Sequence, residues 1–363
     1  MARSLRVAPE YIQQVKSAPQ RHGYPSQQSL ASDVGFSLST VKSFLNGKPI
    51  DYLNFVELSN KLGFKWQDIA HKESETQLSK FQSTNGEASP FITGAPITQP
   101  RYFFGREKEL KRLFNLLKRH PLQNAAIIGK KRSGKTSLLH YLKNITTTPV
   151  QQLRPEQKSD WLPHPENYQW VFVDLQDARM QSREGLLKYI LESLKLQVPT
   201  PCDLDNFMDV VSDNLHSPTV ILLDEIGVGL QRCPELDDGF WESLRSLATN
   251  HTSGNLAFIL ATPESPIELA KSTGHSSPFF NIFGYTAYLG ALTNTEAREL
   301  IASSPIPFTD ENVEWILRQS CCWPLLLQIL CREKLFNLEE GENDNNWREE
   351  GLRQIKPFTD LFS

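Results

Sequence analysis

The stretch that decides the fold is GKKRSGKTS, residues 129–137. It satisfies the spacing G-x-x-x-x-G-K-[ST], which a chain of this length matches by chance roughly once in a hundred. Its surroundings support it, because the apolar run NAAIIG before it predicts a buried strand and TSLLHYLKNI after it predicts an amphipathic helix. A strand, a glycine-rich turn and a helix in this order are typical of a loop that holds phosphate groups. The residues of the stretch that we expect at the phosphates are Gly129, Ser133, Gly134, Lys135, Thr136 and Ser137.

The residue types in this loop explain how it would bind a nucleotide. Glycines let backbone N–H groups turn toward phosphate oxygens, and the start of the following helix adds the positive end of its dipole. The Lys135 ammonium is expected to reach the β- and γ-phosphates of ATP, and the Thr136 hydroxyl is expected to ligate Mg²⁺. Lys130, Lys131 and Arg132 are not required by the motif, and we expect them to be solvated. The alternative is a glycine-rich turn with no ligand.

A second strand ends in two carboxylates. The run TVILLDEIG, residues 219–227, predicts a buried strand followed by Asp224 and Glu225. Because ligands bind at the carboxyl ends of strands in a parallel sheet, Asp224 is expected to hold the Mg²⁺ shell beside the phosphate loop. Glu225 is expected to orient an attacking water, which makes it a candidate catalytic residue together with Lys135. The alternative is two solvated acids after a strand.

Three further apolar runs predict the rest of an α/β sheet. They are YQWVFVDLQD at 168–177, NLAFILATPES at 255–265 and YTAYLG at 285–290. Thr262 lies near the end of the second run, where its hydroxyl is a candidate contact to the γ-phosphate or, equally, a cap or turn residue. Strands that alternate with helical stretches in this way predict a parallel sheet with helices on its faces.

The sequence around the loop resembles a known family. RYFFGREKELKRLFNLLK at 101–118, the acidic pair DE, and FWESLRSLATN with LAFILATP resemble the AAA+ and STAND ATPases of the origin-recognition type. LGALTNTEARELI and CCWPLLLQILCREK at 321–334 resemble the helical lid of the same family. The resemblance covers about residues 100 to 335. It implies a P-loop NTPase sheet of order 5-1-4-3-2 with a helical lid over the nucleotide.

Some nucleotide contacts come from this resemblance alone. It places Gly105 and Arg106 near the adenine and ribose end of the nucleotide, and it places Pro324 against the nucleotide from the lid. One position departs from the family pattern, because Cys322 stands where the family has a glycine two residues before the lid proline. A backbone contact that needs the conformational freedom of glycine is therefore expected to be altered.

The resemblance also implies arginines at the γ-phosphate, and their assignment stays open. Arg318 and Arg332 both lie near the lid motif, and the sequence favours neither. Arg245 in SLRSLA is a candidate for the arginine that a neighbouring subunit of a homo-oligomer would insert into the site. Without a clear pair of arginines, the chain is expected to be a slowly hydrolysing switch rather than a motor.

The N-terminal part of the chain predicts a separate helical domain. In SQQSLASDVGFSLSTVKSFLNGKPI at 26–50, Leu30 and Ala31 mark the apolar face of one helix, and Val41 and Phe44 mark that of the next. This string of four to five short helices resembles the helix-turn-helix domains of the Cro and phage-repressor type, whose second helix enters the major groove. The residues expected at DNA bases or phosphates are Ser39, Thr40, Lys42, Ser43 and Lys48.

Charge is segregated along the chain. Residues 1–72 carry nine Lys and Arg against five Asp and Glu, a net charge of +4 in a chain whose total is −4. The remainder is therefore at −8, and positive charge is concentrated at the candidate DNA-binding end. The second helix of the pair holds no arginine, so weak or shape-based contact with duplex DNA is favoured over sequence-specific contact. The alternative is a helical module that binds an unknown protein partner.

Composition divides the chain into five segments. They are a helix-turn-helix domain at 1–70, a flexible linker at 71–100, a P-loop ATPase core at 101–292, a helical lid at 293–338 and an acidic tail with a short C-terminal segment at 339–363. No run approaches the ~18 apolar residues that a membrane span needs, and MARSLRVAPE lacks the apolar stretch of a signal peptide. Five cysteines without metal-type spacing are expected to be reduced thiols, which favours a cytoplasmic protein.

These features favour one function over two others. The favoured function is an AAA+ or STAND-type switch that binds ATP and Mg²⁺, forms a nucleotide-dependent homo-oligomer and associates with duplex DNA. The first alternative is a STAND protein of signalling or defence whose N-terminal domain binds a protein partner. The second alternative is a transposition or plasmid regulator of the AAA+ type that assembles on DNA.

Overall fold

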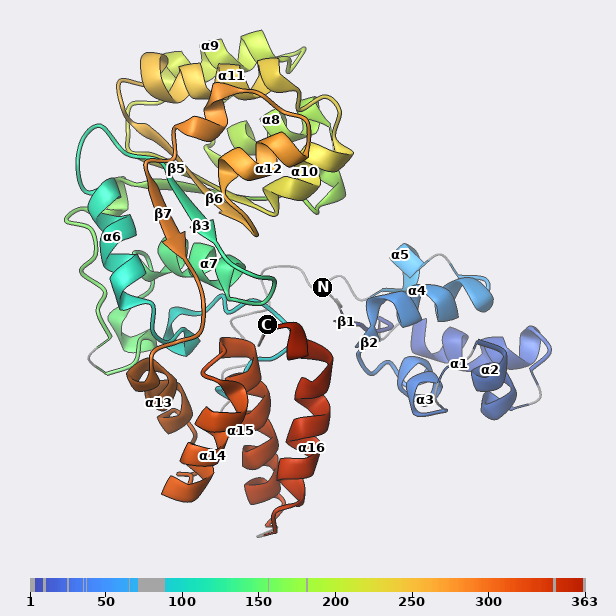
Figure 1. Ribbon diagram of the computed structural model, residues 1–363. Coiled ribbons are helices and arrows are strands. Elements are labelled where there is room, and N and C mark those ends of the chain that lie inside the picture. The colour runs from blue at the N-terminus through green and yellow to red at the C-terminus, as the bar shows by residue number, and fades with distance from the viewer. Residues whose placement is uncertain are drawn as a thin grey trace. The chain divides into compact units, whose positions relative to one another are not determined.

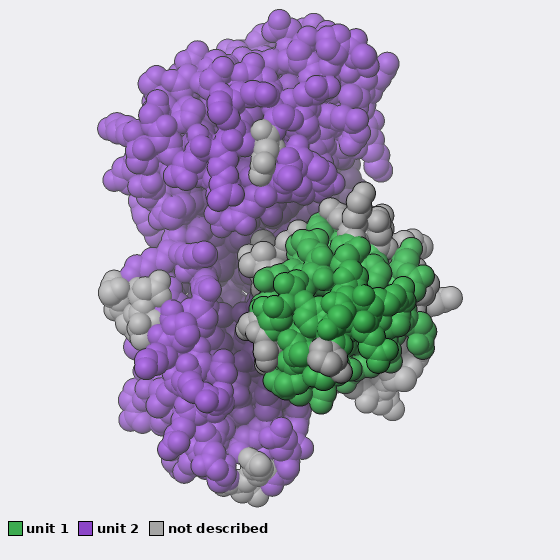
Figure 2. All heavy atoms as spheres, turned by 90° about the vertical axis from the view of Figure 1, so that its right-hand side faces the viewer, with its two compact units in different colours: residues 1–88 green, residues 89–363 purple. Residues whose placement is uncertain are grey.

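The computed structural model describes most of the chain as two compact units. The described residues are 4–8, 11–24, 26–34, 36, 38–64, 66–70, 89–155, 157–180, 182–341 and 344–361. Unit 1 is residues 1–88 and unit 2 is residues 89–363, which Figure 2 shows in separate colours. None of the helices within the described ranges is both long and apolar enough to cross a bilayer.

Unit 1 is a small helical domain. Among its described residues, β1 (Ser4–Leu5) pairs antiparallel with β2 (Ile50–Asp51). Its helices are α1 (Ile12–Arg21), α2 (Gln27–Val34), α3 (Leu38–Leu45), α4 (Tyr52–Lys61) and α5 (Trp66–Ile69). The apolar faces of α2 and α3 meet in one core, in which Leu30 and Phe44 are fully buried. Phe44 also contacts the edge of Phe55 from α4, with ring centroids 5.2 Å apart.

Unit 2 contains a five-stranded sheet in which all neighbouring strands are parallel. The strands are β3 (Ala125–Ile128), β4 (Gln169–Asp174), β5 (Thr219–Asp224), β6 (Leu256–Thr262) and β7 (Tyr285–Tyr288). Their order across the sheet is β4-β5-β6-β3-β7. When β3 is counted as the first strand, this is the predicted order 5-1-4-3-2, so the expected P-loop NTPase sheet is confirmed.

Helices cover both faces of this sheet (Figure 1). They are α6 (Glu107–Leu117), α7 (Lys135–Ile145), α8 (Arg183–Ser193), α9 (Leu204–Asn214), α10 (Ile226–Arg232), α11 (Asp238–Ser246) and α12 (Pro266–Ser272). Because side chains alternate along a strand, Ile221 and Leu223 of β5 pack with α8 to α12 on one face. Val220 and Leu222 of the same strand pack with α6 and α7 on the other. Burial on both faces explains why the strands are near-continuous apolar runs in the sequence.

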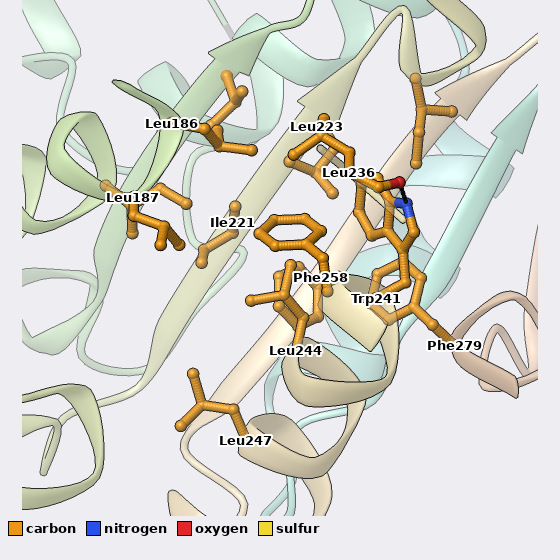
Figure 3. Close-up of a cluster of buried hydrophobic side chains, with 14 of the residues drawn as sticks. Leu186, Leu187, Ile221, Leu223, Leu236, Trp241, Leu244, Leu247, Phe258 and Phe279 are labelled. Carbon is orange, nitrogen blue, oxygen red and sulfur yellow. Dashed lines mark hydrogen bonds between the residues drawn. The ribbon is translucent and has the colours of Figure 1, made fainter. Parts of the chain in front are cut away.

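The larger of these two hydrophobic layers contains an aromatic cluster (Figure 3). Trp241 of α11 is fully buried with its ring centroid 5.1 Å from that of Phe279, and Phe279 contacts the edge of Phe258 from β6 at 5.3 Å. The Trp241 indole N–H donates to the carbonyl of Leu236 at 2.8 Å, so this polar group is satisfied inside the core. The cluster therefore fixes α11 against β6, next to the strand that carries Asp224.

Four helices follow the sheet and form a lid with its own core. They are α13 (Asn294–Ala302), α14 (Asp310–Ser320), α15 (Pro324–Glu339) and α16 (Asn346–Ile355), and the 3₁₀ turn η9 (Lys356–Leu361) ends the described chain. Composition predicts an acidic tail at 339–363, but α16 and η9 instead bury Trp347, Ile355 and Leu361 in the lid core. The acidic Glu349 lies on the exposed side of α16, so the polar composition conceals an amphipathic helix.

The last part of the predicted linker, residues 89–100, is packed. Of residues 71–100, the part up to residue 88 lies outside the described chain, and the rest belongs to unit 2. The Ile92 N–H donates to Oε1 of Gln328 in α15 at 2.9 Å, and the Ile97 N–H donates to Oγ of Ser137 in α7 at 3.0 Å. This segment therefore joins the lid to the helix that follows the phosphate loop. Composition alone predicts a flexible linker here. It cannot show this role, because the side chains that bind the backbone come from distant parts of the sequence.

Candidate nucleotide-binding site

The loop between β3 and α7 has the backbone conformation of a phosphate cradle. Gly134 has a φ of 95° and Arg132 a φ of 70°, both in the left-handed region, just before α7 begins. At Gly129 there is no room for a side chain, since an added Cβ would lie 2.4 Å from Oγ of Ser133 and 2.7 Å from the carbonyl of Leu289. A turn of this kind directs N–H groups to one side, where the helix N-terminus adds its dipole. The predicted order of strand, loop and helix is therefore present.

Lys135 lies inside this cradle and is 9% exposed. Its ammonium donates to the carbonyls of Gly129 at 2.8 Å and Lys130 at 3.1 Å. Burial lowers the pKa of Lys135, and the charges of Glu225 and Asp224 oppose that shift. The ammonium is thus held by loop carbonyls that phosphate oxygens can replace, which is the position that its predicted role requires.

Asp224 ends β5 as a carboxylate that is 1% exposed. Its Oδ1 accepts from the Glu225 N–H at 3.1 Å, and its Oδ2 has no hydrogen-bond partner in the described part of the chain. Burial raises the pKa of Asp224 to about 6; the Thr136 hydroxyl opposes this rise, and the negative charges of Glu225 and Asp174 add to it. A buried carboxylate oxygen without a partner is unfavourable unless a cation or a proton compensates it.

These oxygen donors fit a Mg²⁺ ion that arrives with a nucleotide. In such sites the ion keeps several waters and takes one or two protein oxygens together with substrate phosphates. Thr136 and Asp224 are the two neighbouring donors, and Oγ of Ser133 is another buried oxygen for which the described structure shows no partner. Within the described ranges, no group of three or more His, Cys, Asp or Glu residues could hold a metal ion. The fit is therefore to an ion that shares its ligands with phosphates.

Two further carboxylates, Glu225 and Asp174, are neighbours of Asp224. Glu225 directly precedes α10 with a φ of 52°, a left-handed conformation that is strained for a residue with a side chain. Asp174 ends β4 in register with Asp224, and its Oδ1 accepts from the Gln176 N–H at 2.9 Å. Asp174 is missing from the residues that the sequence singles out. Its signal is the carboxylate that ends the strand QWVFVD, and the predicted strand order already places this strand beside β5, but only the register in the structure shows that Asp174 lies opposite Asp224.

Thr262 lies at the end of β6 with its hydroxyl engaged locally. The residue is fully buried, and its Oγ1 donates to the carbonyl of Glu264 at 3.0 Å. Its own carbonyl accepts from the Gly129 N–H at 3.2 Å, which ties β6 to the phosphate loop. This local bond is the one that a turn role predicts, and the contact with the γ-phosphate stays a prediction. A contact to the γ-phosphate would require the hydroxyl to leave Glu264.

Arg106 braces the phosphate loop against the end of the sheet. It is buried with a φ of 65°, and its N–H donates to Oε1 of Glu296 at 2.6 Å. Its guanidinium donates to the carbonyls of Gly290 and, at 3.4 Å, of Ser133. Burial lowers the pKa of Arg106, and the carboxylates of Glu109 and Glu296 oppose this shift. The side chain is therefore engaged with protein carbonyls, and its contact with the ribose stays a prediction.

Pro324 is the first residue of α15. The turn before it contains Cys322, the position at which the family pattern has a glycine. Cys321 has a φ of 45° and Cys322 a φ of 59°, so both residues adopt, despite their side chains, the left-handed conformation that glycine adopts freely. The carbonyl of Cys322 accepts from the Leu292 N–H at 2.9 Å, which fastens the start of the lid to this turn. The cysteine is therefore tolerated with backbone strain. The contact of Pro324 with a nucleotide stays a prediction.

The arginines that the resemblance leaves open lie in different environments. Arg332 in α15 donates to Oγ1 of Thr93 at 2.5 Å and to Oε1 of Glu333 at 2.7 Å, so it is engaged within unit 2 away from the loop residues. Arg318 near the end of α14 is exposed, and Arg245 on α11 is half-buried. None of their described contacts reaches the phosphate loop, so their roles stay predictions.

Solved structures share the fold of unit 2. The chain is similar to the Walker-type ATPase of Pyrococcus abyssi with a TM-score of 0.52 and 16% identity over 74% of this chain and 77% of that chain. It is also similar to the ORC2 protein of Aeropyrum pernix, solved in ADPNP and ADP complexes, with a TM-score of 0.54 and 14% identity over 73% of this chain and 71% of that chain. No family model and no curated protein sequence matches the chain. At these identities the similarity shows the shared fold and nothing finer.

In unit 1, the residues predicted to contact DNA lie on α3 and in the turn after it. They are the exposed Lys42 and Lys48, the half-buried Thr40 and Ser43, and Ser39, whose side chain lies outside the described part of the chain. The Asn46 amide donates to the carbonyl of Lys42 at 2.9 Å, and the Lys48 N–H donates to the carbonyl of Ser43 at 2.8 Å. These bonds end α3 at Leu45, and they fix the backbone of both lysines.

Proposed function

We propose that the protein is an ATP-binding switch of the AAA+ type, with Mg²⁺–ATP held by the loop at 129–137. The observation that carries this proposal is that Lys135, Asp224 and Ser133 are buried together at the carboxyl edge of a parallel sheet. Two oxygens of this group have no partner among the described residues, and the lysine is held only by carbonyls. Magnesium phosphate would satisfy all three groups. The similar ORC2 protein was solved with ADPNP and ADP, which supports a nucleotide in this fold.

Each residue of the site has a task in this proposal. Lys135 leaves the two loop carbonyls and donates to the β- and γ-phosphates. Thr136 and Asp224 hold the ion, which neutralises phosphate charge when bound. Glu225 accepts a hydrogen bond from the attacking water and orients it toward the γ-phosphate. The strained backbone of Glu225 is a reason to expect that its side chain is placed for such a task.

Hydrolysis is expected to be slow, so that the bound nucleotide acts as a timer. An arginine that stabilises the charge of the transition state contributes a factor of about 10³–10⁵ in rate in related phosphoryl transfers. Arg332 is engaged by Thr93 and Glu333, which leaves it poorly placed for this task. We propose that a neighbouring subunit supplies the arginine, with Arg245 as the candidate. The ATP-bound form would then assemble into a homo-oligomer before it hydrolyses ATP.

The variant Lys135→Ala tests the nucleotide site. Loss of the ammonium should weaken the binding of Mg²⁺–ATP at least about 100-fold, because charge-assisted bonds to two phosphates are lost. Calorimetric titration measures this affinity. Lys131→Ala is the matched control, since Lys131 is exposed in the same loop and outside the motif, and its affinity should stay within about threefold of wild type. Unchanged ATP binding by Lys135→Ala would sink the assignment of the site.

We further propose that unit 1 associates with duplex DNA through α3. The support is the fixed, exposed pair Lys42 and Lys48 together with the net positive charge of residues 1–72. Lysines at a helix end suit contacts with phosphates, which give affinity but little sequence information.

All five cysteines are free thiols, which fits a reducing compartment such as the cytoplasm.

Charge reversal at Lys42 tests this contact. Lys42→Glu should weaken binding to duplex DNA by about tenfold at low salt and leave ATP affinity unchanged, because phosphate contacts are electrostatic. Lys16→Glu, an equal change at an exposed position of α1, is the control. If the wild-type protein does not bind duplex DNA at low salt, the proposed DNA contact is wrong, and unit 1 is better explained as a domain that binds a protein partner. Filaments that grow on DNA with ATP would identify a regulator that assembles there.

A further inference from the structure

The last described turn of the chain contacts the phosphate loop. The guanidinium of Arg132 lies over the ring of Phe358 in η9, with its Cζ 4.0 Å from the ring centroid. In Figure 1 the red turn η9, where the described chain ends, lies beside the loop that precedes α7. The sequence predicts that Arg132 is solvated, and the side chain is indeed exposed, but its cation is also stacked on an aromatic ring. Stacking of this kind is a cation–π contact at close range.

Phe358 is itself fixed by the lid. Its ring packs against the lid core, and the flanking anchors Ile355 and Leu361 are 5% and 3% exposed. The backbone at Phe358 departs from helical geometry, with a φ of −116° and a ψ of 22°, between these two anchors. The ring that meets Arg132 therefore belongs to a packed element of the lid.

Arg132 occupies a position at which a partner for its side chain matters. Its φ of 70° is left-handed, a conformation that is unfavourable for a residue with a Cβ and free of strain for glycine. Arg132 directly precedes Ser133 and Gly134, so a change in its backbone angles would redirect the N–H groups that form the phosphate cradle. Any contact that holds the Arg132 side chain in place also opposes that change.

We infer that Phe358 is a positioning residue for ATP binding, because its ring holds Arg132 in the left-handed conformation and so keeps the phosphate loop shaped for phosphates. The inference rests on the ATP site proposed above and gives the C-terminal turn a part in forming it. Since Phe358 is packed in the lid and Arg132 lies in the loop, the contact also couples the lid to the shape of the loop. Loosening η9 lowers ATP affinity without removing any phosphate ligand.

The variant Phe358→Leu tests the stack, because leucine keeps apolar packing on the lid but has no π face. We expect the Kd for Mg²⁺–ATP, measured by calorimetric titration, to rise about threefold to tenfold. Phe358→Tyr keeps the ring and should stay within about twofold of wild type. Leu352→Ala, at an exposed position of α16, is the matched control and should bind as wild type does. Loss of affinity in the leucine variant that the tyrosine variant does not share supports the inference.

The variant Arg132→Gly separates the stack from other effects of Phe358. Glycine adopts a positive φ without strain, so the loop no longer needs the ring, and Phe358→Leu should have no further effect in this background. Wild-type affinity in Phe358→Leu overturns the inference, as does an equal loss of affinity in the Arg132→Gly background. These results leave the proposed function in place. A wild-type protein that binds no ATP instead overturns the proposed function, and the inference with it.

Discussion

Ionisation of Asp224 makes the folding stability and the Mg²⁺ affinity of the site depend on pH. Burial raises its pKa to about 6, whereas an aspartate in an unfolded chain titrates near about 3.9. Between these two values the folded protein keeps a proton that the unfolded chain has released, so folding stability falls as pH rises through this window. Above the window the buried charge is present in full. Mg²⁺ affinity should rise through the same window, because the ion binds the ionised carboxylate.

The variant Asp224→Asn removes this buried charge. Without nucleotide and Mg²⁺, it should raise the free energy of unfolding at pH 8 by up to about 3 kcal/mol. At pH 4 the effect should be much smaller, because the carboxyl of the folded wild-type protein is then protonated. Urea unfolding at the two pH values measures the difference, with Glu242→Gln on the exposed side of α11 as the control. An equal effect at both pH values would contradict a raised pKa at Asp224.

The residues of the phosphate loop could be predicted because their chemistry depends on spacing along the chain. Gly129 is an example. The motif requires glycine at this position, and in the structure an added Cβ would overlap Oγ of Ser133. Asp174 could not be selected in the same way, because it meets Asp224 only through the register of two strands. The stack of Phe358 on Arg132 joins two residues that are far apart in the sequence, and no local pattern indicates it.

At the scale of elements, the sheet could be predicted and the last lid helix could not. Strands buried on both faces are continuous apolar runs, so each strand of the sheet has a strong local signal. In α16 only Trp347, Gly351 and Ile355 are buried, and the surrounding acidic and amide residues explain why composition predicts an acidic tail there. Gly351 lets α16 approach α15 closely, since an added Cβ would lie 2.8 Å from Cδ2 of Leu330. The helical spacing of the three buried residues is therefore a better guide to this segment than its composition.

The variant Trp347→Ala tests the docking of α16. Trp347 is buried and meets Trp315 edge-to-face with ring centroids 4.9 Å apart, so its removal should lower the free energy of unfolding of the lid by about 3–5 kcal/mol. Urea unfolding followed by tryptophan fluorescence, with limited proteolysis at the α15–α16 connection, measures this loss. Arg353→Ala, an exposed member of a surface ion pair with Glu350, should lose no more than about 0.5 kcal/mol. A loss below about 1 kcal/mol for Trp347→Ala would contradict the docked helix.

At the scale of the whole molecule, the two proposed activities belong to different units. The candidate nucleotide site lies within unit 2, and the lysines proposed for DNA lie in unit 1. ATP can change DNA binding only if the nucleotide-bound and nucleotide-free forms differ in their affinity for DNA. Assembly of ATP-bound copies would create this difference, because several linked DNA-binding units bind one duplex with higher avidity. The sequence indicates both units, but it contains no local pattern for such coupling.

The most direct measurement is therefore the affinity for a duplex DNA at fixed salt with Mg²⁺–ATP, with ADP and without nucleotide, with the native mass recorded in each state. ATP should raise both the assembled mass and the DNA affinity, the latter by about tenfold or more, because avidity follows assembly. Lys135→Ala should lose both responses. A wild-type protein that binds ATP, yet shows the same mass and the same DNA affinity in all three states, would contradict the switch.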